Sequence, residues 1–322
     1  MKEPQMRRPA ERLSAMVEEQ GWKGRIVSIG HLADLREAIL GRFEQGLIDE
    51  RLYREQLGFF SFDPPADFPG ACSIIIVAAP TPQMRIAFHW QGIRVSVVVP
   101  PTYVSYTPRT ESVQAALAAR LQHDGFRLTK PKLPLKTLAA RSGLVNYGRN
   151  NICYAPGMGS FFQLVGAFSD IPCDDDPWRD PALLPRCKSC VACLRSCPTG
   201  AIVKDRFLLH AERCLTYHNE AAAEFPTWID PSWHHCLFGC LRCQTTCPEN
   251  NAVRDWFEDR AEFSEDETGL IIAQAPIDRL PPEMVTKWQR LEINEDYGLL
   301  CRNLKMIICN QQRGTASPPQ PS

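Results

Sequence analysis

Cysteine spacing is the feature that most constrains this chain of 322 residues. Residues 187–198 hold four cysteines separated by two, two and three residues, and a proline follows the last one. A shorter echo lies at 240–248, where three cysteines are separated by two and three residues and again precede a proline. The chain has 14 cysteines, and its first residues lack the apolar stretch of a secretion signal. We therefore expect metal ligation or redox chemistry rather than disulfides.

The first motif has the spacing of bacterial two-cluster ferredoxins. Three closely spaced thiolates can wrap one face of a compact [4Fe-4S] cubane. The following turn carries the fourth cysteine away, so that it ligates the other cluster. Paired CxxC units can also hold structural zinc. The triple spacing, the Cys-Pro ending and the echo favour two [4Fe-4S] clusters instead.

The echo lacks one ligand, because Leu237 occupies the position where its first cysteine would stand. Two cysteines could replace it, namely Cys236, which is one residue out of place, and the isolated Cys214. We assign Cys214 and keep Cys236 as the alternative. The predicted ligands of one cluster are Cys187, Cys190, Cys193 and Cys247, and those of the other are Cys197, Cys214, Cys240 and Cys243.

Composition indicates a globular protein without an obvious charged partner. Hydrophobic residues make up 44% of the chain, and the net charge is −1. The apolar runs 73–80 and 95–101 are too short to span a bilayer and predict buried strands. We expect a cytoplasmic protein with no membrane contact. Glycine loops of the nucleotide-binding types are absent from the sequence. Electrons should then come from a low-potential donor of the ferredoxin or flavodoxin type.

The order of predicted elements indicates an α+β fold: an α/β N-terminal domain, a bacterial-ferredoxin-like double-cluster domain and a helical C-terminal segment. Helices are predicted at 9–20, 31–48, 110–125 and 133–144, and strands at 25–30, 73–79 and 95–99. The predicted domains are 1–172, which would bind a corrinoid or substrate, 173–252 with two clusters, a helical segment 253–310 and a disordered tail 311–322. Within the helical segment, WFEDRAEF (256–263) and PPEMVTKWQRL (281–291) are the clearest predicted helices.

With this cysteine pattern, the chain resembles the epoxyqueuosine reductase family. Those enzymes depend on cobalamin, carry two [4Fe-4S] clusters and are related to reductive dehalogenases. The likeness covers 187–248, where Cys214 is followed by Thr216 and Tyr217. It extends to SGLVNYGRNNICY (142–154) and GMGSFFQLVGAFSDIP (157–172). The matching residues there are Gly148, Arg149, Asn150, Gly159 and Ser160.

The resemblance implies a cofactor site. In the family, cobalamin lies between the α/β domain and the cluster domain, and the near cluster reduces its cobalt. By position, four residues of this chain would lie near the corrin: Lys136, Asn150, Ser160 and Thr216. Each of them could instead cap a helix or stabilise a turn.

Two departures from the family concern the substrate. The position of the family's acidic proton donor holds Thr129, and no carboxylate lies between Asp124 and Asp170. A threonine cannot act as a carboxylic acid, so Asp124, Tyr147 or Tyr154 would have to donate the proton.

Residues 265–322 carry six Lys or Arg and eight Asp or Glu, whereas a tRNA-binding surface is expected to be basic. The sequence thus predicts a reductase that passes electrons to a corrinoid or a small-molecule substrate, with tRNA not expected as a partner. The alternative is a non-catalytic electron-transfer module that serves a partner protein.

Overall fold

The computed structural model describes residues 8–293 and 297–315. Its larger sheet, sheet A, is built around the β-branched run SIIIVAAP, a composition that favours strands. This run forms β2 (Ser73–Pro80). Antiparallel β1 (Lys23–Ser28) and β8 (Phe162–Ser169) flank it, and β5 (Leu128–Thr129) completes the order β1-β2-β8-β5.

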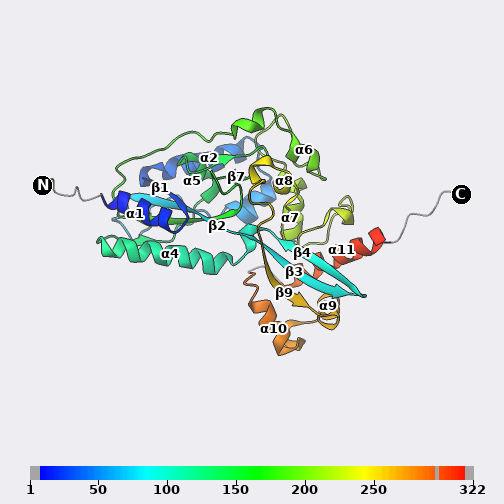
Figure 1. Cartoon of the computed structure of the whole chain (residues 1–322). Helices are drawn as coiled ribbons and strands as arrows, with labels where there is room; N and C mark the ends of the chain where they lie inside the picture. The colour runs from blue at the N-terminus through cyan, green and yellow to red at the C-terminus, as the bar shows by residue number, and fades with distance from the viewer. Residues whose placement is uncertain (1–7, 294–296, 316–322) are drawn as a thin grey trace.

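Helices cover both faces of sheet A (Figure 1). Successive side chains of a strand point to opposite faces, so Ile74 and Ile76 join one core and Ile75 joins the other. The first core includes residues of α2 (Leu32–Glu44) and α5 (Leu135–Arg141). The second includes residues of α1 (Pro9–Glu19) and α4 (Tyr106–His123). The result is a three-layer α/β unit, as the sequence predicts.

A second sheet, sheet B, joins distant parts of the chain. The hairpin β3 (Gln83–Trp90) and β4 (Ile93–Val99) pairs through β3 with β9 (Phe257–Phe263), and β3 and β9 run parallel. The prediction of a helix over 256–263 is therefore wrong. Pairing with β3 decides the conformation, because it places Phe263 in a stacked contact with Phe88 at 5.1 Å between ring centroids.

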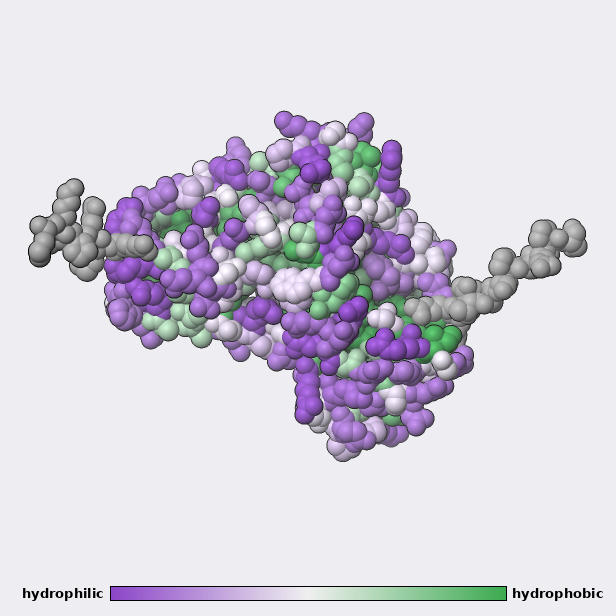
Figure 2. Space-filling model, in the orientation of Figure 1, coloured by the Kyte–Doolittle hydropathy of each residue, from purple (hydrophilic) through white to green (hydrophobic). Residues whose placement is uncertain are grey.

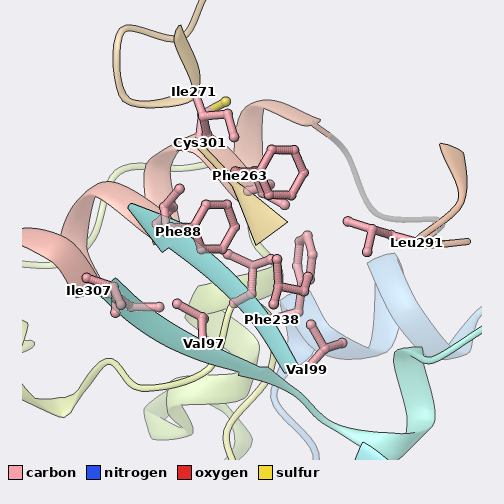
Figure 3. Close-up of a cluster of buried hydrophobic side chains, with 14 of the residues drawn as sticks. Phe88, Val97, Val99, Phe238, Phe263, Ile271, Leu291, Cys301 and Ile307 are labelled. Atoms are coloured by element: carbon pink, nitrogen blue, oxygen red, sulfur yellow. The ribbon is translucent and has the colours of Figure 1, made fainter. Parts of the chain in front are cut away.

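Sheet B packs against the C-terminal helices α9 (Glu265–Ile272), α10 (Pro282–Gln289) and α11 (Tyr297–Thr315). Figure 3 shows this core, in which Phe88 and Val97 of the hairpin meet Phe238, Phe263 and Cys301. It combines residues from all three predicted domains. Helix α11 also occupies 311–315, which the sequence assigned to a disordered tail. The rest of that tail, 316–322, lies outside the described residues.

The cysteine-rich stretch contains only short helices: α6 (Ala192–Ser196), α7 (Leu215–Glu220) and α8 (Arg242–Thr245). A small hairpin, β6 (Asn146–Tyr147) and β7 (Cys153–Tyr154), completes the strands. Short α3 (Glu50–Leu52) leads into a π-helical turn, Tyr53–Leu57. Hydrophilic residues predominate on the face drawn in Figure 2. Within the described part of the chain, no helix is both long and apolar enough to cross a bilayer.

Candidate cluster and ligand-binding site

The seven cysteines of the two motifs and the isolated Cys214 line two cavities. A small cavity is lined by Cys187, Cys190, Cys193 and Cys247. A large cavity of about 930 Å³ is lined by Cys197, Cys214, Cys240 and Cys243. Helices α6 and α8 pack together, which brings the first motif against its echo. The division into two groups is the one that the spacing predicts, although ligation by each individual residue remains a prediction.

The two candidates for the eighth ligand lie in different surroundings. Cys214 lines the large cavity and is the N-cap residue of α7. Burial raises the pKa of the Cys214 thiol, and the neighbouring Thr216 and Tyr217 oppose that shift. Cys236 is fully buried, lines neither cavity and forms a bridge to Val98 of β4. Cys214 therefore stays our predicted eighth ligand.

The segment 148–154 contacts both cysteine groups. The backbone N–H of Arg149 donates to Cys187 Sγ at 3.4 Å. Asn150 Nδ2 donates to the Tyr154 hydroxyl at 2.9 Å and to the backbone carbonyl of Cys243, in the other group, at 3.3 Å. One turn of chain thus supplies polar contacts to both cysteine groups.

Burial sets the ionisation of these thiols in the absence of iron. It raises the pKa of Cys193 to about 11 and that of Cys240 to about 12. Both side chains are therefore neutral thiols at pH 7 until a metal displaces the proton. Among the described residues, no three His, Cys, Asp or Glu side chains converge on a single-ion site. Ligands of a cubane stand farther apart, since each thiolate binds its own iron.

All four residues that the resemblance places near a corrin line the large cavity: Lys136, Asn150, Ser160 and Thr216. Three of them also have structural partners, as the turn and capping alternative predicts. Ser160 Oγ donates to Gln244 Oε1 at 2.8 Å and accepts from Asn250 Nδ2 at 2.8 Å. Lys136 is exposed and makes no ion pair with a described residue.

Gly159 explains how the turn before Ser160 reaches the cysteine-rich stretch. Its φ is +57°, and a Cβ atom at this position would lie 2.3 Å from Asn250 Oδ1. Only glycine allows this approach. Asn250 Oδ1 accepts the Ser160 backbone N–H at 2.8 Å. This contact joins the strand β8 side of the cavity to the chain just beyond Cys247.

The three candidate proton donors, Asp124, Tyr147 and Tyr154, lie in different surroundings. Asp124 does not line the cavity, and its hydrogen bond from Arg12 holds the pKa of that carboxyl at about 2. Tyr154 does not line the large cavity either. Tyr147 does, and its hydroxyl donates to the Cys153 sulfur, while burial raises the pKa of Tyr147. Thr129 lies in β5, outside the lining.

Several lining residues could not be found from sequence motifs. Two lining carboxylates, Asp49 and Glu55, come from a segment far from the cysteine pattern, and a third, Glu220, ends helix α7 after Cys214. Two buried polar atoms in the lining, Gln163 Oε1 and Thr110 Oγ1, have no hydrogen-bond partner among the described residues. No local pattern marks these positions, because only the tertiary fold brings β8, α4 and the 45–60 segment to one cavity.

Comparison with known proteins links the cysteine-rich stretch to iron–sulfur clusters. Residues 186–250 match the model of a 4Fe-4S double cluster binding domain. The chain is 36% identical over 107 residues to the epoxyqueuosine reductase of Pseudomonas aeruginosa, covering 31% of this chain and 28% of that protein. It is 33% identical over 112 residues to the enzyme of Burkholderia pseudomallei, covering 33% and 27%. The chain thus spans less than a third of these relatives' length.

The likeness in fold is more extensive. The structure of epoxyqueuosine reductase from Bacillus subtilis matches with a TM-score of 0.66 and 21% identity, over 93% of this chain and 81% of that one. The enzyme from Streptococcus thermophilus matches with a TM-score of 0.67 and 17% identity, over 94% and 81%. The chain is therefore similar to epoxyqueuosine reductases in fold over most of its length, and in sequence over 31–33% of it. Both the predicted resemblance and the predicted fold class are confirmed.

One of the similar structures also contains a nucleic acid. One similar structure holds epoxyqueuosine reductase with an epoxyqueuosine-modified stem loop of tRNA-Tyr, at a TM-score of 0.67 and 18% identity over 95% of this chain. The expectation that tRNA is not a partner conflicts with this finding. Summed charge in the C-terminal 58 residues was a weak guide, because it ignores how a fold distributes basic side chains.

Proposed function

We propose that this protein is an iron–sulfur reductase that passes electrons through two [4Fe-4S] clusters to a ligand in the large cavity. One observation carries the proposal: the group Cys197, Cys214, Cys240 and Cys243 lines that cavity directly. A cluster held there would meet a bound ligand without intervening protein. The double-cluster domain match and the names of the similar proteins support the same reaction class.

The proposed ligand sets follow the two cavities. The group of Cys187, Cys190, Cys193 and Cys247 would hold the outer cluster, because it opens to a separate small cavity. Exposed Lys188 and Arg195 lie within the first motif. Positive charge there suits an acidic donor protein, such as a ferredoxin or flavodoxin. Reduced thiols also fit a cytoplasmic location.

A corrinoid fits the residues of the large cavity. Its volume of about 930 Å³ lies at the upper end of ligand sites. Gln163 Oε1 and Thr110 Oγ1 are polar atoms that the protein leaves unpaired, and they could bind amide groups at a corrin's edge. When bound, a corrinoid supplies a low-potential metal centre for reduction of the substrate. Here Asn150, Ser160 and Thr216 would fix the cavity wall, while Lys136 would face the ligand.

The test is anaerobic reconstitution with iron and sulfide, followed by addition of cob(II)alamin and EPR spectroscopy. We expect about eight irons per chain and a shift of the cobalt signal to a protein-bound, base-off form. The reconstituted protein is then assayed with an epoxyqueuosine-containing stem loop, the substrate named by its relatives. An unchanged cobalamin spectrum with both clusters intact would overturn the corrinoid site and leave the protein an electron-transfer module.

A further inference from the structure

The lining of the large cavity carries more positive than negative side chains. Five basic residues line it against three acidic ones, and the basic residues are Arg42, Lys130, Lys132, Lys136 and Arg242. Both arginines donate to backbone carbonyls, Arg42 to Ala38 and Arg242 to Trp233. The three lysines are exposed. Among the described residues, no ion-pair partner reaches their ammonium groups.

None of the lining carboxylates forms an ion pair with these lysines in the described part of the chain, and each has another polar partner. Asp49 Oδ1 accepts the Leu52 backbone N–H at 2.9 Å. Glu55 pairs with Arg51 at 2.8 Å. Glu220 accepts a hydrogen bond from the Tyr103 hydroxyl. The stretch that carries the lysines contains no carboxylate, and none occurs between residues 124 and 170.

The lysines project from an ordered stretch of chain. Residues 130–134 connect β5 to α5 and contain two prolines, which restrict the backbone, and Lys136 is the second residue of α5. Pro131 and Leu135 pack so closely on β8 that a Cβ atom added to Gly166 would lie 3.0 Å and 2.8 Å from them. The carbonyl of Lys132 accepts the Ser61 N–H at 2.9 Å. The backbone that carries the three lysines is therefore held in place beside the cavity.

A second, independent observation indicates that the cavity binds a ligand. Gln163 is 2% exposed, and its Nε2 donates to the carbonyls of Pro101 and Val104. Its Oε1 has no partner. Thr110, 6% exposed, also leaves its hydroxyl unpaired. Buried polar atoms are almost always paired, so atoms like these in a cavity wall indicate a missing partner. Most of the wall around them is apolar.

We infer that the cavity takes an organic anion: an apolar body that fills the cavity and a carboxylate, sulfonate or phosphate held by Lys130, Lys132 and Lys136. The inference rests on the proposed function only in taking this cavity as the place where a ligand binds. A phosphate could belong to a substrate or to the nucleotide portion of a bound corrinoid. The chemistry of recognition is the same in both cases.

Two probes with the same aromatic body test the charge requirement. The holoprotein is titrated with 1-anilinonaphthalene-8-sulfonate and with the uncharged N-phenyl-1-naphthylamine, and fluorescence reports binding. In the triple variant Lys130→Gln, Lys132→Gln, Lys136→Gln we expect roughly tenfold weaker binding of the sulfonate and unchanged binding of the neutral probe. Lys305→Gln, at an exposed position on α11, is the matched control. An equal loss of binding for both probes would overturn the inference.

A second comparison separates the two sources of phosphate. Cobalamin and cobinamide differ in the nucleotide portion, and their binding is followed by absorbance in the same variants. Weaker binding of cobalamin alone assigns the anion to the cofactor, whereas weaker binding of the sulfonate probe alone assigns it to a substrate. Unchanged binding of every anion sinks the inference. Iron content and the cob(II)alamin EPR signal are measured separately, so failure of the reductase proposal would be distinguishable.

Discussion

The choice between Cys214 and Cys236 as the eighth ligand yields the sharpest prediction. Replacing Cys214 by alanine removes one of the four predicted ligands that line the large cavity, the others being Cys197, Cys240 and Cys243. A cubane with three protein thiolates and no replacement ligand is readily lost. We expect Cys214→Ala to lose about four of about eight irons per chain and about half of the cluster absorbance.

Cys236→Ala should behave differently, because this side chain lies in the protein core and not in a cavity. Loss of one buried sulfur should cost about 1 kcal/mol of unfolding free energy, through the small void left behind. Iron content should stay at the wild-type value. Each variant removes one cysteine sulfur, so comparing the two separates the loss of a cluster ligand from the loss of core packing.

The assay is colorimetric iron per folded chain after anaerobic reconstitution, with EPR of the dithionite-reduced protein. In Cys214→Ala the signal of interacting clusters should be replaced by that of one isolated cluster. Cys301→Ala is a further control, since Cys301 is buried near sheet B and lines neither cavity. Loss of iron from Cys236→Ala together with full iron in Cys214→Ala would refute the assignment.

Three further predictions concern the surroundings of the clusters. Ser160→Ala should lower the unfolding free energy by about 1–3 kcal/mol in chemical denaturation, because it leaves Gln244 Oε1 and Asn250 without their shared hydroxyl; unchanged stability would contradict that contact. Gly159→Ala should prevent full cluster loading, measured as iron content, since its Cβ would lie 2.3 Å from Asn250 Oδ1. Burial lowers the pKa of His234 to about 4, below the unfolded value of about 6.5. The unfolded state then binds more protons, so the free energy of unfolding should decrease as the pH is lowered from 6.5 to 4. This decrease should be smaller in His234→Phe, and parallel pH profiles of the two proteins would refute the prediction.

Local sequence signals predicted much of the first half of the fold. The run 73–80 and the periodic stretches that became α1, α2 and α5 carry their own pattern. The prediction for 257–263 failed because the four charged residues of this strand suit a helix, and only pairing with β3 determines its conformation. Strand β3 itself escaped prediction. Non-local pairing leaves no mark within a short window.

The candidate site was likewise only partly predictable from the sequence. Cysteine spacing predicted the two groups, because the protein must fit a cofactor of fixed size. The resemblance led to Asn150 and Ser160, yet both proved to be part of hydrogen-bond networks as well. Gln163 and Lys130 could not be found from the sequence. Their importance depends on an unpaired buried atom and on the absence of nearby carboxylates, and both are properties of the folded surface.

The parallel pairing of β3 with β9 has a consequence for how the protein is made. Arg85 bonds Asp259, 174 positions later in the chain, so sheet B closes one of the longest loops in the molecule. All eight predicted ligands lie between these two strands in the sequence. During synthesis the thiols leave the ribosome before β9 is available to complete the sheet. Sheet B is therefore completed only after all eight predicted ligands have been synthesised.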